Sequence, residues 1–196
     1  MNYNHYKKAR DMAWKTLIEC KINRLPVDLW QIAAHYNLKI HVYSKSAICQ
    51  LLKEDILNGD GFIIYIGNEK HIFINDKINN KNRRRFTLAH ELGHAILEHD
   101  IGVIHYRHSE HDNKTKLEEW QANIFARNIL MPATVLAALN IHTPDEIMNM
   151  CAVSRHAAEV RAERMQELLS RNMFDTSPAE QKVHKLFCDF ISNYKK

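Results

Sequence analysis

The chain has 196 residues, of which 45% are hydrophobic and 26% are charged. This composition is typical of a globular domain and excludes a disordered or fibrous chain, and the net charge of +4 is too small to indicate a nucleic-acid-binding protein. No apolar run approaches the roughly eighteen residues of a membrane helix, and the first twenty residues do not resemble a signal peptide, which predicts a cytoplasmic protein without a membrane contact.

The N-terminal part predicts two helices followed by a small sheet. Apolar residues recur at helical spacing in 4–21, and a second helix is expected to start after Leu25-Pro26 and stop near Asn37. Residues 38–43 alternate as a strand does, and 61–66 and 71–75 flank a short turn and predict a hairpin. An edge of this sheet either receives an extended substrate or only supports the helices.

The stretch His90-Glu91-x-x-His94 carries the clearest chemistry. Residues four apart lie on one face of a helix, so both histidines can direct a ring nitrogen at one metal ion. Glu91 lies about 100° further round the helix, where it can take a proton from water. The alternative is an ordinary amphipathic helix with solvated histidines. Gly93 weakens a helix by about 1 kcal/mol and therefore predicts a close approach of another backbone.

A third metal ligand has to come from elsewhere in the chain. A metzincin would need Gly and His where this chain has Leu97 and Asp100. Glu119 is the preferred candidate, on a second helix that places Asn123 four residues later on the same face, where its side chain can accept a hydrogen bond from a ligating histidine. The alternative for Glu119 is a solvated helix start balanced by nearby lysines.

Three ordered motifs resemble the ImmA/IrrE family of metallopeptidases. They are Arg85-Phe86-Thr87-Leu88-Ala89-His90-Glu91-Leu92-Gly93-His94, Glu119-x-x-Ala122-Asn123-x-Phe125-Ala126 and Ile129-Leu130-Met131-Pro132. The resemblance spans roughly residues 20–170 and implies a gluzincin-like site holding one Zn²⁺ per chain. Its ligands would be His90, His94 and Glu119, with Glu91 as the catalytic carboxylate. Trp120-Gln121 departs from the family pattern without touching the ligand position.

The segment 98–113 between the two motif helices is rich in polar side chains. Tyr106, His108 or His111 is a candidate donor to the oxyanion that forms during peptide hydrolysis. A histidine of this segment is also the alternative third ligand.

The basic run before the motif helix has three interpretations. Lys81, Arg83, Arg84 and Arg85 either form ion pairs and solvated surface, contact an acidic substrate, or bind DNA. The first interpretation is favoured.

After Pro132 the sequence predicts only helices. One runs through Val135 and Leu139, one starts at Thr143, and a third is capped by Ser154. The segment 143–168 resembles a helix-turn-helix and is the place where nucleic acid would bind, through Arg155, Arg161 and Arg164; support of the peptidase core is the favoured role. Residues 171–196 predict a linker and one last amphipathic helix. We therefore expect a domain at 1–170, with 132–170 as its helical part, and an appended segment at 171–196.

Together these patterns predict an α+β, zincin-like fold: a small, mostly antiparallel sheet packed against a helical core carrying HExxH, followed by a helical C-terminal region. The expected activity is that of a zinc-dependent, site-specific endopeptidase. The resemblance implies an intracellular regulatory protein as substrate, of the repressor or antitoxin type, belonging to a mobile element such as a phage or to a stress response. The alternative is a non-catalytic zinc-containing module that regulates transcription by binding DNA or a partner protein.

Overall fold

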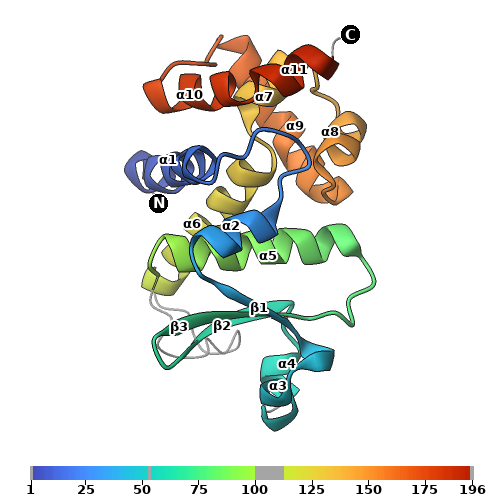
Figure 1. Cartoon of the computed structure of the whole chain (residues 1–196). Coiled ribbons are helices and arrows are strands. Elements are labelled where there is room, and N and C mark those ends of the chain that lie inside the picture. Colours follow the sequence, from blue (N-terminus) through green and yellow to red (C-terminus); the bar gives the residue numbers. More distant parts are fainter. Residues whose placement is uncertain (1, 53, 100–112, 195–196) are drawn as a thin grey trace.

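A computed structural model describes residues 2–52, 54–99 and 113–194. In these ranges the chain is mostly helical and contains one small sheet, as Figure 1 shows, which agrees with an α+β fold. The strands are β1 (Lys39–Val42), β2 (Gly61–Ile66) and β3 (Glu69–Ile74). The helices are α1 (Tyr3–Glu19), α2 (Leu29–His35), α3 (Ala47–Leu51), α4 (Glu54–Leu57), α5 (Lys81–Ile96), α6 (Asn113–Leu130), α7 (Ala133–Ala138), α8 (Pro144–Cys151), α9 (Arg155–Ser170), α10 (Pro178–Leu186) and α11 (Cys188–Tyr194).

The sheet is mixed, with the strand order β1-β3-β2. The predicted hairpin is present, with β2 antiparallel to β3, but β1 pairs with β3 in parallel. The expectation of a mostly antiparallel sheet is therefore wrong for β1. The helices α3 and α4, which were not predicted from the sequence, lie between β1 and β2 in the chain. They carry the chain from β1 to the opposite edge of the sheet, where β2 lies. Strand β3 then returns and pairs between the two outer strands.

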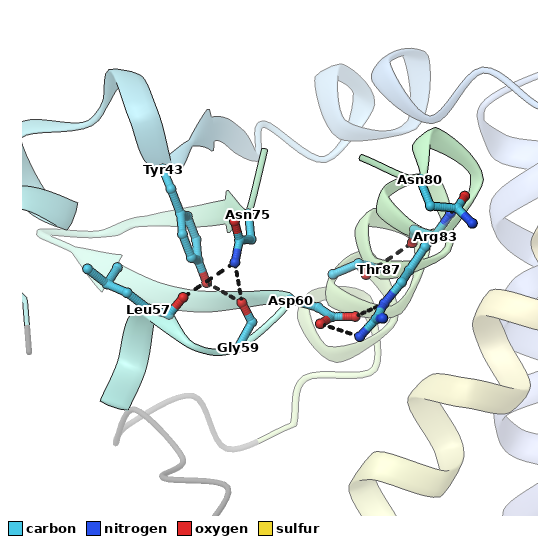
Figure 2. Close-up of polar contacts among 8 residues, drawn as sticks. All are labelled: Tyr43, Leu57, Gly59, Asp60, Asn75, Asn80, Arg83 and Thr87. Carbon is cyan, nitrogen blue, oxygen red and sulfur yellow. Dashed lines mark hydrogen bonds and ion pairs between the residues drawn. The ribbon is translucent and has the colours of Figure 1, made fainter. Parts of the chain in front are cut away.

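The start of β2 is fixed against the first turns of α5. A Cβ atom on Gly61 would lie 2.8 Å from Thr87 Cγ2 and 2.9 Å from the carbonyl oxygen of Phe73, so only glycine allows this approach. Figure 2 shows the polar contacts beside it. Arg83 Nε and Nη2 donate to the carboxylate of Asp60 at 2.7 and 2.8 Å, and Asn80 caps α5 by accepting a hydrogen bond from Arg83 N.

Helices α5 and α6 lie in contact along their middle turns. A Cβ atom on Gly93 would come within 3.3 Å of the Cα and carbonyl oxygen of Ala122. The prediction that Gly93 marks a close backbone approach is confirmed. This contact brings the face of α6 that carries Glu119 next to the motif helix.

The C-terminal helices pack on the N-terminal one. Helix α10 contacts α1 and α7, and Val183 and Phe187 belong to the same buried core as Ala13 and Leu17 of α1. The prediction of a single last helix is wrong, because α10 ends at Leu186 and α11 begins at Cys188. Among the described residues, no helix combines the length and the apolar character needed to cross a bilayer.

Candidate metal centre

Helix α5 buries the whole HExxH motif. His90, Glu91 and His94 are 8%, 5% and 9% exposed, within a run of buried residues that extends from Thr87 to Ile96. The Nε2 atoms of His90 and His94 lie 3.0 Å apart. Two ring nitrogens this close, both directed inward, need a proton or a cation between them.

Helix α6 places Glu119 over this pair. Glu119 Oε2 lies 3.3 Å from His90 Nε2, and Glu119 Oε1 lies 3.4 Å from His94 Nε2. The Glu119 side chain is 42% exposed, in contrast to the buried imidazoles. The three groups therefore form a shallow site that has buried nitrogen donors and an oxygen donor facing solvent.

The spacing of these atoms fits a zinc ion. Zinc binds histidine nitrogen and carboxylate oxygen at about 2.0–2.2 Å in a tetrahedron, so neighbouring ligand atoms are separated by about 3.3–3.5 Å. The measured separations of 3.0 to 3.4 Å are close to this range. Within the described ranges, His90, His94 and Glu119 form the group whose ligand atoms all lie within 4.8 Å of one another.

The charges at the site also favour a cation. Burial raises the pKa of the Glu119 carboxyl group, but hydrogen bonds and charge from His90 and His94 outweigh it and hold this pKa below its usual range. Burial lowers the pKa of His90, whereas the hydrogen bond to Glu119 and the charge of Glu91 raise it, and the net shift is upward. Both carboxylates thus stabilise positive charge between the rings.

Each histidine has a polar partner at its other ring nitrogen. Asn123 Oδ1 lies 3.1 Å from His90 Nδ1, so the amide oxygen accepts the Nδ1 proton and leaves Nε2 free to bind a metal. His99 Nδ1 lies 3.0 Å from His94 Nδ1, and His99 is only 6% exposed. The sequence analysis anticipated the contact of Asn123 but not that of His99.

A family model described as the IrrE N-terminal-like domain, from a family of peptidases, matches residues 21–163, which is 143 of the 196 residues. The chain belongs to this family. A stretch of 74 residues is 36% identical to the "Radiation response metalloprotease IrrE" of Deinococcus radiodurans and covers 36% of this chain and 22% of that protein. The match thus spans less than a quarter of the Deinococcus protein. Both findings support a metalloprotease and agree with the resemblance seen in the motifs.

Several residues considered for this IrrE-family site lie outside the described residues. They are the oxyanion candidates Tyr106, His108 and His111, of which the two histidines were also alternatives for the third metal ligand. In the part of the chain that the structure describes, Glu119 is the carboxylate that lies together with the two motif histidines.

A cleft opens beside the candidate metal centre of this IrrE-family chain. Its volume is about 600 Å³, and it lies where α5, α6 and the start of α9 meet. Thr87 and Asn123 line it, and these residues are one helical turn from Glu91 and Glu119. Phe86, Met131 and Val160 give it apolar walls. A cleft of this size with mostly apolar walls and a few polar groups is typical of a ligand-binding site.

The arginines discussed above have partners within the chain. Arg83 pairs with Asp60, Arg84 donates to the carbonyl of Asp76 and Arg85 to the carbonyl of Val27. These contacts support the structural interpretation of the basic run.

The arginines of α9 differ in their surroundings. Arg155 pairs with Asp145, and Arg164 pairs with Glu167. Arg161 is only 1% exposed and donates through Nε to the carbonyl of Met131 at 2.7 Å. The proposed phosphate contact of Arg161 is therefore wrong: its guanidinium group is enclosed by the core and binds the end of α6.

Proposed function

We propose that this chain is a zinc-dependent endopeptidase that cuts at a specific site in a regulatory protein inside the cell, of the repressor or antitoxin type. The observation that supports it most is the convergence of His90 Nε2, His94 Nε2 and a Glu119 oxygen at spacings that suit zinc. Three protein ligands leave a fourth position for water or substrate, as in catalytic rather than structural zinc sites.

The roles follow from chemistry and position. His90, His94 and Glu119 would hold a zinc ion, which would supply polarisation of a peptide carbonyl group and easier deprotonation of water at this place. Glu91, buried directly after His90, takes a proton from the water that attacks the carbonyl carbon and passes it to the nitrogen of the leaving amine. The new C–O bond and the broken C–N bond give a carboxylic acid and an amine. Asn123 keeps His90 in the tautomer whose Nε2 faces the metal.

The substrate is proposed to bind as an extended segment. Strand β2 is an edge of the sheet, and its first residue, Gly61, lies against Thr87 in the helical turn before Glu91. An edge strand offers backbone groups to a further strand. The cleft lined by Phe86, Met131 and Val160 would then take a large apolar side chain next to the bond that is cut.

The regulatory nature of the substrate rests on the family. Resemblance to ImmA/IrrE peptidases suggests a repressor or antitoxin of a mobile element or of a stress response. The name of the Deinococcus relative links that protein to a radiation response, which supports the second possibility. Two findings weaken a purely DNA-binding role: Arg161 is buried, and the salt bridge to Asp145 occupies Arg155.

The test compares metal content with proteolysis. Wild type, Glu119→Ala and Glu91→Gln are purified, their zinc is quantified, and each is incubated with a peptide library prepared from the host's own proteins. New N-termini are then identified by mass spectrometry. Glu118→Ala is the matched control, since Glu118 neighbours Glu119 but pairs with Lys114 at 4.0 Å.

We expect Glu119→Ala to lose zinc and Glu118→Ala to keep it. Glu91→Gln should keep zinc and cleave at least about 100-fold more slowly, because it lacks the general base. Cleavage sites with a large apolar residue at a fixed position would identify the specificity of the cleft. If wild type holds zinc and Glu91→Gln cleaves as well as wild type, the metal centre is a scaffold, and the non-catalytic alternative replaces the proposal.

A further inference from the structure

The inference concerns how His94 is held, and it rests on the proposed metal site. His94 Nε2 faces His90 Nε2 and Glu119, so this nitrogen carries the lone pair that a metal ion would use. The single proton of a neutral His94 ring then lies on Nδ1. His99 Nδ1, 3.0 Å away, has to be the acceptor of that proton.

The position of His99 depends on the way α5 ends. Glu98, directly after the helix, has a φ of 57°, in the left-handed region, and the backbone N–H of His99 donates to the carbonyl of His94 at 3.1 Å. This turn folds the chain back, so that the ring of His99 lies edge-on to the ring of His94, with centroids 5.0 Å apart. The position of His99 is thus fixed by the turn that ends α5.

The second nitrogen of His99 carries the remaining proton. If Nδ1 accepts, the proton of the neutral His99 ring lies on Nε2, which is buried and has no hydrogen bond to the described part of the chain. The contact that orients the His99 ring is therefore the one with His94.

We propose that His99 is a positioning residue of the candidate metal centre. By accepting a hydrogen bond at its own Nδ1, it fixes His94 as the tautomer with its proton on Nδ1. Asn123 does the same for His90 with a single contact.

The test measures metal affinity and needs no substrate. Zinc dissociation constants are determined by competition with a chromophoric chelator for wild type, His99→Phe and His99→Asn. Phenylalanine keeps the volume and removes the acceptor, whereas asparagine at position 99 offers an amide oxygen. His35→Phe, at an exposed histidine of α2, is the matched control.

We expect His99→Phe to weaken zinc binding about 10- to 100-fold, the usual effect of removing a hydrogen-bond partner of a ligating histidine. His99→Asn should recover part of this loss, and His35→Phe should bind as wild type does.

A second readout separates positioning from stability. The absorption spectrum of the cobalt-substituted protein reports the geometry around the metal and should change in His99→Phe. Unchanged zinc affinity and an unchanged cobalt spectrum in His99→Phe, with only a lower melting temperature of the metal-free protein, would overturn the inference and leave the proposed function intact. A wild-type protein that binds no zinc would instead overturn the proposed function.

Discussion

Gly93 of α5 lies directly against α6, where an added Cβ atom would be 3.1 Å from Phe125 Cδ1 and 3.3 Å from the backbone of Ala122. The separation of the two helices at this point determines how far Glu119 lies from the histidine pair. Packing and metal binding are thus linked through one residue that has no side chain.

The substitution Gly93→Ala tests this link. Alanine favours an isolated helix by about 1 kcal/mol over glycine, but overpacking a close contact costs about 1–3 kcal/mol, so we expect a net loss of stability. Moving α6 outward should also weaken zinc binding. Urea unfolding of the metal-free protein and chelator competition measure the two effects.

The matched control is Gly59→Ala, where the nearest atom to an added Cβ, the carbonyl oxygen of Ile56, is 3.4 Å away. It should leave zinc affinity unchanged. A Gly93→Ala protein that is as stable as wild type and binds zinc equally well would show that α5 and α6 adjust freely.

The imidazoles of His41 and His71 give the sheet a dependence on pH. The rings are stacked with centroids 5.1 Å apart, and His41 Nε2 lies 2.9 Å from His71 Nδ1. Burial, together with the nearby charge of His71, lowers the pKa of His41 below 6.5. The unfolded chain therefore binds more protons than the folded one just below pH 6.5, and stability should fall as the pH falls through that window.

His41→Phe should reduce this loss, because phenylalanine cannot bind a proton and still stacks on Phe73, whose ring lies 4.8 Å from that of His41. The free energy of unfolding of metal-free wild type and metal-free His41→Phe is compared from pH 5 to 8. All other titrating groups are shared by the two proteins and contribute equally to both curves. A constant difference between the two curves over the whole range would contradict the assignment of this pH dependence to His41.

Filling the cleft tests where the substrate binds. Ala157 of α9 lines the cleft, and Ala157→Trp should raise KM for a cleaved peptide at least several-fold while zinc affinity stays unchanged. Glu159→Trp, on an exposed position of the same helix, is the control. Equal kinetics of both variants would place the substrate elsewhere.

Arg161 is predicted to act in stability and not in binding. Its guanidinium group donates to Met131 O and Asn128 Oδ1 inside the core, so Arg161→Met would leave these two acceptors unsatisfied at a cost of about 2–4 kcal/mol. Arg155→Met, at an exposed pair with Asp145, should cost about 1 kcal/mol or less. Urea unfolding measures the free energy of unfolding of both variants. Comparable losses of stability in the two variants would contradict a stabilising role of Arg161 in the core.

Local patterns predicted much of the arrangement of side chains at the candidate site. The spacing of four residues put His90 and His94 on one face, and the same spacing related Glu119 to Asn123, whose amide does reach His90. Capping residues were also informative: Thr143 and Ser154 cap the helices that follow them. The helical spacing and the caps lie within one or two turns of a single helix, where the sequence period determines geometry.

The features that the sequence did not predict depend on tertiary contacts. The parallel pairing of β1 depends on a crossover of short helices over 43–60, which carry little periodicity of their own. His99 follows the end of α5, and its contact with His94 depends on the left-handed turn at Glu98. Glutamate has no special preference for that conformation, so the sequence contains no signal for the turn.

A metal ion bound at this centre would act as a cross-link within the chain. It would join His94 to Glu119 across the 24 residues between them and so remove conformations from the unfolded ensemble. The entropy of closing such a loop grows only with the logarithm of its length, and doubling the segment would cost about 0.6 kcal/mol. The length of the connection between α5 and α6 should therefore have only a small effect on the stability that a metal ion would add.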